Sequence, residues 1–424
     1  MTTNIQESFA LEWLAAHQDQ IVDFCRRLIQ TPSVNGENPE RLLAEVIAQE
    51  AQLLGLPFSI VGDQPERPNV IVSSSEQGAT GLLLVGHLDT VPAGDASQWS
   101  YPPFDAHIAN DRIYGRGAID TKGGMAASIY AIKALLECNA LQNGRAQFIG
   151  VPDEESGATG TLGIRYLARH GLLSGLGAIY AYSGDEINLG HRGLLRYRLE
   201  CHGESVHSGS PAWQDRISGA NAVAGMARLI AALDALQFPY SSARYFEPYK
   251  SVVSAGTMIS GGTAVNIVPD YCESWLDVRL TPELDRPAFE HILNAEIARL
   301  TAPKLQFTVT CINDVPAVIS DETAPLIAAV ESAIYAVKGL TAKRTVAGPA
   351  NEGYLLIGQG IPTICGLGPS GANAHAPDEY VELQGLVQAA QIFCTHRSTA
   401  RPAECVIPPT YVSVEFLKSS IRRW

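Results

Sequence analysis

The stretch Leu82-Leu83-Leu84-Val85-Gly86-His87-Leu88-Asp89-Thr90-Val91-Pro92 decides how this chain is organised. Its four consecutive apolar residues are typical of a strand that is covered on both faces, as in a parallel sheet. Gly86 then delivers His87 and Asp89 at the carboxyl end of the strand, where open α/β sheets place their chemistry. Because residues two apart point to the same side of an extended chain, one of this pair can bind a metal ion while the other orients it.

Predicted strands and helices alternate around this stretch, which indicates a doubly wound, mixed but largely parallel α/β sheet. The expected strands 146–151 and 178–182 are followed by acidic residues, and another acid lies in the glycine-rich loop 115–124. If the sheet is parallel, these carboxylates share one rim with His87 and Asp89; they are Asp120, Glu154, Glu155 and Asp185. Carboxylates crowded on one rim repel each other unless cations are bound, and imidazole together with carboxylate suits zinc, manganese or cobalt.

Each of these residues also has a simpler interpretation. An aspartate such as Asp120 or Asp185 after a strand often caps a helix, and adjacent glutamates such as Glu154 and Glu155 often form a solvated turn. A single histidine such as His375 is more often a surface residue than a ligand. The joint occurrence of such residues at successive strand ends favours a metal site over these alternatives.

A different pattern occupies residues 194–311, where the predicted order of elements is β-α-β-β-α-β. This order resembles a ferredoxin-like α+β domain inserted into the larger one. We therefore expect a catalytic domain formed by 1–193 and 312–396, an inserted lid and dimerisation domain at 194–311, and a C-terminal extension at 397–424.

Composition limits the classes of function. The chain has 424 residues, of which 46% are hydrophobic, so it can bury a large core, and extensive disorder is not expected. A net charge of -14 without a basic run argues against nucleic acid or an anionic membrane as partner. The N-terminus has no signal-peptide pattern, and no apolar run approaches the roughly 18 residues that span a bilayer, so a cytoplasmic location is expected.

Several motifs together resemble the M20 family of metallopeptidases and deacylases, which includes acetylornithine deacetylase, succinyl-diaminopimelate desuccinylase, aminoacylase 1 and the glutamate carboxypeptidases. The motifs occur in the family's order and lie at 86–92, 115–124, 153–155, 185 and 374–381. The resemblance implies two divalent metal ions, most often zinc, with Asp120 as bridging ligand. It implies His87 and Asp185 as ligands of one ion, Glu155 and His375 as ligands of the other, Glu154 as general base, and Asp89 as the residue that orients His87.

The inserted domain has its own counterparts in the family. The segment 206–211 resembles a lid motif whose histidine, here His207, stabilises the oxyanion and often comes from the neighbouring subunit of a homodimer. The segment 261–270 resembles one in which an asparagine, here Asn266, contacts substrate. Arg279 is a further substrate-binding candidate, although an arginine at a strand end is more often in a surface ion pair.

The chain departs from the family at residues 348–353, where many relatives read Gly-Thr-Ser-Asp-Ala-Arg and this chain reads Gly-Pro-Ala-Asn-Glu-Gly. The hydroxyls and the arginine that could grip a substrate carboxylate are missing. Glu352 could accept a substrate amine or cap the following helix, and the loop 366–371 could offer backbone donors to a carboxylate.

The expected function is dinuclear metal-dependent hydrolysis of a small-molecule amide, foremost an N-acyl amino acid. A dipeptidase or carboxypeptidase of the same family would share every catalytic residue. An unusual deamination or decarbamoylation is a further alternative, because of the departure at 348–353. A non-enzymatic binding protein is disfavoured by the presence of all ligands and the base, and a serine hydrolase by the lack of Gly-x-Ser-x-Gly.

Overall fold

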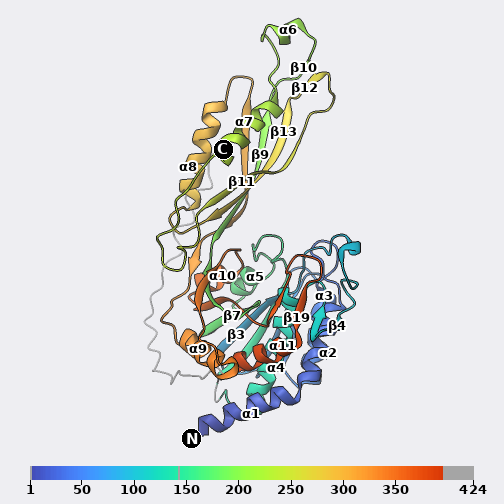
Figure 1. The fold of residues 1–424 in the computed structure, drawn as a ribbon, viewed down its shortest axis with the longest axis vertical. Coiled ribbons are helices and arrows are strands. Elements are labelled where there is room, and N and C mark those ends of the chain that lie inside the picture. The colour runs from blue at the N-terminus through green and yellow to red at the C-terminus, as the bar shows by residue number, and fades with distance from the viewer. Residues whose placement is uncertain (1, 142–143, 395–424) are drawn as a thin grey trace.

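The computed structural model of the chain describes residues 2–141 and 144–394, so the expected extension at 397–424 lies outside the described residues. A lower body contains both ends of the described chain, and an elongated upper part is inserted into it (Figure 1). The central sheet of the body has nine strands, in the order β1-β2-β6-β3-β7-β17-β8-β15, with β16 also paired to β8. Their bounds are β1 Phe58–Val61, β2 Asn69–Ser73, β3 Ala79–His87, β6 Gly144–Val151, β7 Gly177–Ala181, β8 Ile187–His191, β15 Val318–Ile319, β16 Arg344–Ala347 and β17 Thr363–Leu367.

The pairing of these strands confirms the expected mixed, largely parallel sheet. At its centre β6, β3, β7 and β17 run parallel, whereas β1, β2 and β15 pair antiparallel with their neighbours toward the edges. The eight helices described in the body are α1 Thr2–Ala16, α2 Gln18–Ile29, α3 Arg41–Leu53, α4 Gly123–Glu137, α5 Ile164–Arg169, α9 Pro325–Lys338, α10 Gly353–Gly358 and α11 Leu383–Cys394.

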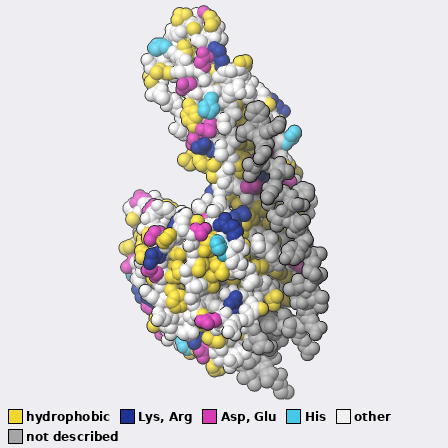
Figure 2. Space-filling model, turned by 180° about the vertical axis from the view of Figure 1, so that it is seen from behind, with side chains coloured by type: hydrophobic (Ala, Val, Ile, Leu, Met, Phe, Trp, Pro, Cys, Tyr) yellow, Lys and Arg dark blue, Asp and Glu magenta, His cyan; other side chains and the backbone are white. Residues whose placement is uncertain are grey.

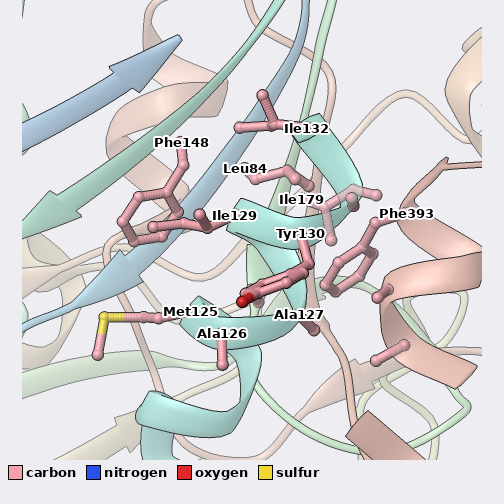
Figure 3. Close-up of a cluster of buried hydrophobic side chains, with 14 of the residues drawn as sticks. Leu84, Met125, Ala126, Ala127, Ile129, Tyr130, Ile132, Phe148, Ile179 and Phe393 are labelled. Atoms are coloured by element: carbon pink, nitrogen blue, oxygen red, sulfur yellow. The ribbon is translucent and has the colours of Figure 1, made fainter. Parts of the chain in front are cut away.

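Strand β3 is covered on both faces, as its run of apolar residues predicts. Leu82 and Leu84 belong to a core that α4 and α11 cover, whereas Leu83 and Val85 belong to a second core with residues of α5 and α10. Figure 3 shows the first of these cores, where side chains of α4 meet Leu84 and Phe148. Burying both faces holds β3 at the centre of the body, and its carboxyl end is held with it.

Helix α4 approaches the sheet so closely that its second residue must be glycine. A Cβ atom on Gly124 would lie 1.9 Å from the backbone oxygen of Ala181, at the end of β7. This close approach follows directly after the turn Ala118–Lys122, in which the backbone of Asp120 is not helical, with a φ of -126° and a ψ of 85°. The packing of α4 against the sheet therefore places the loop that carries Asp120 close to the ends of the central strands.

The inserted part is built on a four-stranded antiparallel sheet in the order β11-β13-β9-β14. Its strands are β9 Gly193–His202, β11 Val252–Gly261, β13 Tyr271–Leu280 and β14 Gln306–Val315, and its two long helices are α7 Ala222–Asp234 and α8 Arg286–Leu300. Both helices share a core with β9 and β13. The order β9-α7-β11-β13-α8-β14 is the expected one, while the domain bounds themselves stay a prediction.

Two small sheets complete the fold. A ribbon of β10 Val206–His207 and β12 Ile267–Val268 lies with the short helix α6 Pro211–Gln214 at the end of the inserted part (Figure 1). In the body, a sheet in the order β18-β19-β5-β4 joins Gly371–Ala372, Tyr380–Glu382, Arg112–Tyr114 and His107–Ala109. This second sheet brings the segment around residue 379 beside the loop at 115–120. A 3-10 turn at Ala96–Gln98 comes before β4 in the sequence.

None of the helices in the described ranges is both long enough and apolar enough to cross a membrane.

Candidate metal centre

Three neighbouring parallel strands bring the acidic motifs to one rim of the sheet. Strand β3 lies between β6 and β7, and His87 is its last residue. The residues that follow β6 include Glu154 and Glu155, and those that follow β7 include Tyr182 and Ser183. Because all three strands point the same way, their carboxyl ends meet, as in other open α/β sheets.

Asp120 stands between two imidazoles on this rim. Its Oδ1 lies 2.7 Å from Nε2 of His87, and its Oδ2 lies 3.3 Å from Nε2 of His375. The same His375 nitrogen is 3.2 Å from Oε1 of Glu155. Ligand atoms of His87, Asp120 and Glu155 all lie within 4.8 Å of one another. Four of the five predicted ligands are therefore brought together, and the Asp120–Thr121 peptide bond beside them is cis.

The chemistry of these donors fits a divalent cation. Hydrogen bonds to Asp120 and Glu155 raise the pKa of His375 to about 10. Although burial opposes it, the hydrogen bonds from His375 and His87 lower the pKa of the Asp120 carboxyl. In these contacts a proton lies between each imidazole nitrogen and a carboxylate oxygen. A divalent cation such as zinc can take the place of that proton, because zinc binds imidazole nitrogen and carboxylate oxygen together.

Glu154 lies beside this cluster and is suited to exchange a proton. Its side chain is buried, and its Oε1 accepts a hydrogen bond of 2.9 Å from the hydroxyl of Tyr182. Burial raises the pKa of Glu154 to about 8. The positive charge of His87 lowers this pKa, whereas the negative charges of Glu155 and Asp120 raise it further. A carboxyl group with a pKa near neutrality can both take and return a proton.

Asp89 holds the site in a different way from the one expected. Nδ1 of His87 donates to the backbone oxygen of Asp89 at 2.8 Å, whereas the Asp89 carboxylate is 3.5 Å from that nitrogen. The buried carboxylate instead accepts the backbone N–H groups of Glu154 at 3.2 Å and Glu155 at 3.0 Å, and the side-chain amide of Asn35 at 2.5 Å. Asp89 therefore orients His87 through its main chain and the two glutamates through its side chain.

A second buried carboxylate, Glu379, positions the loop of Asp120. It accepts hydrogen bonds from the backbone N–H groups of Gly117, Ile119 and Asp120 at 3.0 to 3.2 Å, and pairs with Arg116 at 2.5 Å. Sequence reasoning assigned no role to Glu379. The available signal was its place four residues after His375 in the same motif.

Asp185 is not brought to this cluster. Its carboxylate forms an ion pair with Lys338, at the end of α9. Gly184 adopts a φ of 83°, which turns the chain between Ser183 and Asp185. As a result Ser183 lines the cleft above the metal centre and Asp185 is not among its lining residues. The geometry gives no support to the prediction that Asp185 is a metal ligand.

The cleft has a volume of about 740 Å³ and lies between the body and the inserted part. Figure 2 shows the hollow between the two parts, with charged side chains and a histidine gathered at its inner corner. Arg192, Arg196 and Arg279 line the cleft together with Glu154 and other residues of the metal centre. Arg279, predicted to bind substrate, therefore faces the cleft, and it also donates to Asp277 at 2.8 Å.

Glu352 does not line the cleft, in contrast to the neighbouring Ala350 and Asn351. It is fully buried, Oε2 accepts a hydrogen bond from Tyr180 at 3.1 Å, and Oε1 has no hydrogen-bond partner among the residues that the structure describes. Burial raises its pKa well above the usual range and so favours the uncharged form of the carboxyl group. This position gives no support to the expectation that Glu352 contacts a substrate amine, and its side chain forms no capping hydrogen bond on α10 either.

His207 and Asn266 lie together at the far end of the inserted part, on the ribbon β10-β12 (Figure 1). Nδ2 of Asn266 is 3.4 Å from Nε2 of His207, and both side chains are exposed. Neither residue lines the cleft of its own chain. The structure thus pairs these two predicted residues with each other and not with the metal centre.

Known proteins resemble this chain in sequence and in fold. A succinyl-diaminopimelate desuccinylase 2 from Shewanella loihica is 28% identical over 383 residues, covering 87% of this chain and 97% of the relative. A metallo-carboxypeptidase of the M20 family from Sulfolobus solfataricus has a similar fold, with a TM-score of 0.73 and 20% identity over 89% of this chain and 98% of the other. A dinuclear metal-binding M20 peptidase from Bacillus subtilis matches with a TM-score of 0.66 and 18% identity, over 90% and 98%.

The profile of a protein family matches residues 83–396, which begin in β3, include the inserted part and reach past α11. This range contains His87, Asp120, Glu155 and His375 as well as Glu154. The resemblance drawn from the separate motifs is therefore confirmed over most of the chain. The chain belongs to peptidase family M20/M25/M40, and it is a hydrolase.

Proposed function

We propose that this hydrolase removes the acyl group from an N-acyl amino acid that carries free carboxylates, of the kind a desuccinylase acts on. The observation that carries the proposal is the basic wall of the cleft, where three arginines face a metal centre. The support from sequence is the similarity to succinyl-diaminopimelate desuccinylases. Zinc is the proposed metal, with cobalt or manganese as alternatives, because the donors are imidazole and carboxylate groups.

Within residues 2–141 and 144–394, the three arginines have fewer carboxylate partners than positive charges. Asp277 accepts hydrogen bonds from both Arg196, at 3.2 Å, and Arg279, at 2.8 Å. Arg192 donates to the backbone oxygen of Gly348 and stacks over Tyr249, and in the described part of the chain no carboxylate lies within ion-pair distance of it. Burial and the charge of Arg279 lower the pKa of Arg192. A substrate carboxylate would supply the missing negative charge.

The residues of this chain divide the reaction between them. The residues that would hold a divalent cation are His87, Asp120, Glu155 and His375. A bound cation would make a water more acidic and polarise the amide carbonyl. Glu154 takes a proton from the attacking water and returns it to the leaving amine, in keeping with its raised pKa. Tyr182 keeps the Glu154 carboxyl in place through its hydroxyl.

We further propose a homodimer that forms through the inserted part. Strand β11 is at the edge of its sheet, so one row of its backbone groups has no strand beside it in the described chain. Met258 and Ile259 on this strand are 64% and 54% exposed, which is a large apolar exposure for an edge strand. Pairing of two β11 strands would cover them, and the exposed His207 of one subunit would then stabilise the oxyanion in the other.

The first prediction concerns the base. Glu154→Gln should lower kcat on an N-acyl amino acid by roughly 100-fold to 10,000-fold, because the amide cannot take the proton from water. Activity would be measured on N-succinyl and N-acetyl amino acids and on dipeptides, with bound metal determined in the same samples. Glu247→Gln changes an exposed glutamate in the same way and is the matched control. Full activity of the Glu154 variant would refute its role, and dipeptides as the fastest substrates would select the dipeptidase alternative.

The second prediction concerns the substrate carboxylate. Arg192→Met should raise KM by roughly 10-fold to 100-fold for an N-succinyl amino acid and leave KM nearly unchanged for its uncharged diamide, since a charge-assisted hydrogen bond is worth about 1.5 to 3 kcal/mol. Arg169→Met, at an exposed position at the end of α5, is the control. If the variant keeps the preference of the unchanged protein for the charged compound, Arg192 does not bind the carboxylate.

The third prediction separates action across a dimer from action within one chain. His207→Ala and Glu154→Gln should each be nearly inactive alone, yet after dissociation and reassociation their mixture should regain about a quarter of the normal activity. Half of the dimers are then mixed, and each mixed dimer has one site with both residues intact. Light scattering on a sizing column would report the mass. A monomer, or a mixture that stays inactive although mixed dimers form, would contradict the proposal.

A further inference from the structure

The metal centre offers unequal numbers of protein ligands to its two sides. On one side, Nε2 of His375 lies 3.3 Å from Asp120 and 3.2 Å from Glu155, so three side chains of different types meet there. On the other side, Nε2 of His87 meets Asp120 at 2.7 Å, and Glu155, which lies within 4.8 Å of both, is already 3.2 Å from His375. Catalytic zinc sites use three protein ligands as a rule, so the side of His87 needs another carboxylate or imidazole.

Asp185, the residue expected to fill that need, is committed to Lys338. The Lys338 side chain is only 6% exposed, and its other recorded partner is the hydroxyl of Ser370 at 3.5 Å. A largely buried ammonium group that loses its carboxylate partner is left with an unpaired charge, so this ion pair opposes any move of Asp185 toward the metal centre. Because Lys338 holds it, Asp185 is not free to serve as a ligand.

No other acidic residue or histidine of the described cleft lining takes this place. The residues of these types that line it are Asp120, Glu154, Glu155 and His375. Glu154 accepts the Tyr182 hydroxyl and is the proposed base. After the end of β7, the residue that faces the cleft is Ser183, whose neutral hydroxyl is a poor substitute for a carboxylate as a zinc ligand.

We propose that the two cation positions differ in affinity: the position beside His375 and Glu155 binds tightly, and the position beside His87 lacks a third strong ligand and exchanges its ion readily. The inference rests on the metal-dependent function proposed above and adds a regulation of it. At low free cation the chain would hold one ion, and occupancy of the second position would follow the concentration of free metal.

The test is a metal titration without substrate. The protein is stripped with a chelator, titrated with Zn²⁺ by calorimetry, and analysed for retained metal after gel filtration. One ion per chain should be retained, and the second should bind at least roughly 100-fold more weakly, since even the loss of an outer partner of a ligand costs 10-fold to 100-fold in affinity. Ser183→Glu should bring the retained metal to two ions, while Ser183→Gln, of the same size without charge, should leave it at one.

Asp185→Asn distinguishes the two assignments of this residue. It should still retain one ion with unchanged affinity, and circular dichroism would confirm that it is folded. Two ions of similar affinity in the unchanged protein, with one lost in Asp185→Asn, would overturn the inference, as would a Ser183→Glu protein that still retains one. A chain that retains no ion at all would refute the metal-dependent function itself, which keeps the two failures distinct.

Discussion

Repulsion among buried carboxylates is the constraint on which the site depends. The parallel ends of β6, β3 and β7 gather Asp89, Glu154 and Glu155 beside His87, and the Asp120 loop adds another acid. The fold satisfies the acids that are not ligands by different means. Asp89 and Glu379 accept backbone N–H groups, whereas burial of Glu352 raises its pKa and favours its uncharged form. The remaining acids, Asp120 and Glu155, lie beside the imidazoles of His87 and His375. A divalent cation bound there would balance their negative charge.

The division of the molecule into two parts gives each a separate task. The body supplies the proposed ligands and the proposed base, on strand ends held by helices on both faces. The inserted part supplies Arg196 and Arg279 to the cleft, and Arg192 lies where the two parts join, between β8 and β9. Chemistry and substrate choice are thus carried by different segments. Members of one family could therefore change substrate without change to the metal centre.

The sequence predicts the fold class, and the meeting of His87 with the acids that follow the neighbouring strand, from local pattern; the place of His375 beside them is implied by the family resemblance alone. The apolar run before His87 indicates a strand buried on both faces, and strand ends in a parallel sheet must meet. Asp185 and Glu352 could not be placed in this way. Asp185 pairs with Lys338, which is distant in the sequence, and Glu352 is hidden behind Tyr180. Such partners depend on tertiary packing, as does the role of Glu379. The domain bounds and the cellular location stay predictions.

Anomalous diffraction at the zinc absorption edge is the most direct test of the central claim, that separate strand ends build one metal centre. Crystals of the chain grown with Zn²⁺ should show an anomalous peak in contact with His375, Glu155 and Asp120. Any second peak should lie beside His87 and be weaker. A protein with zinc bound elsewhere and no peak at these residues would contradict the claim.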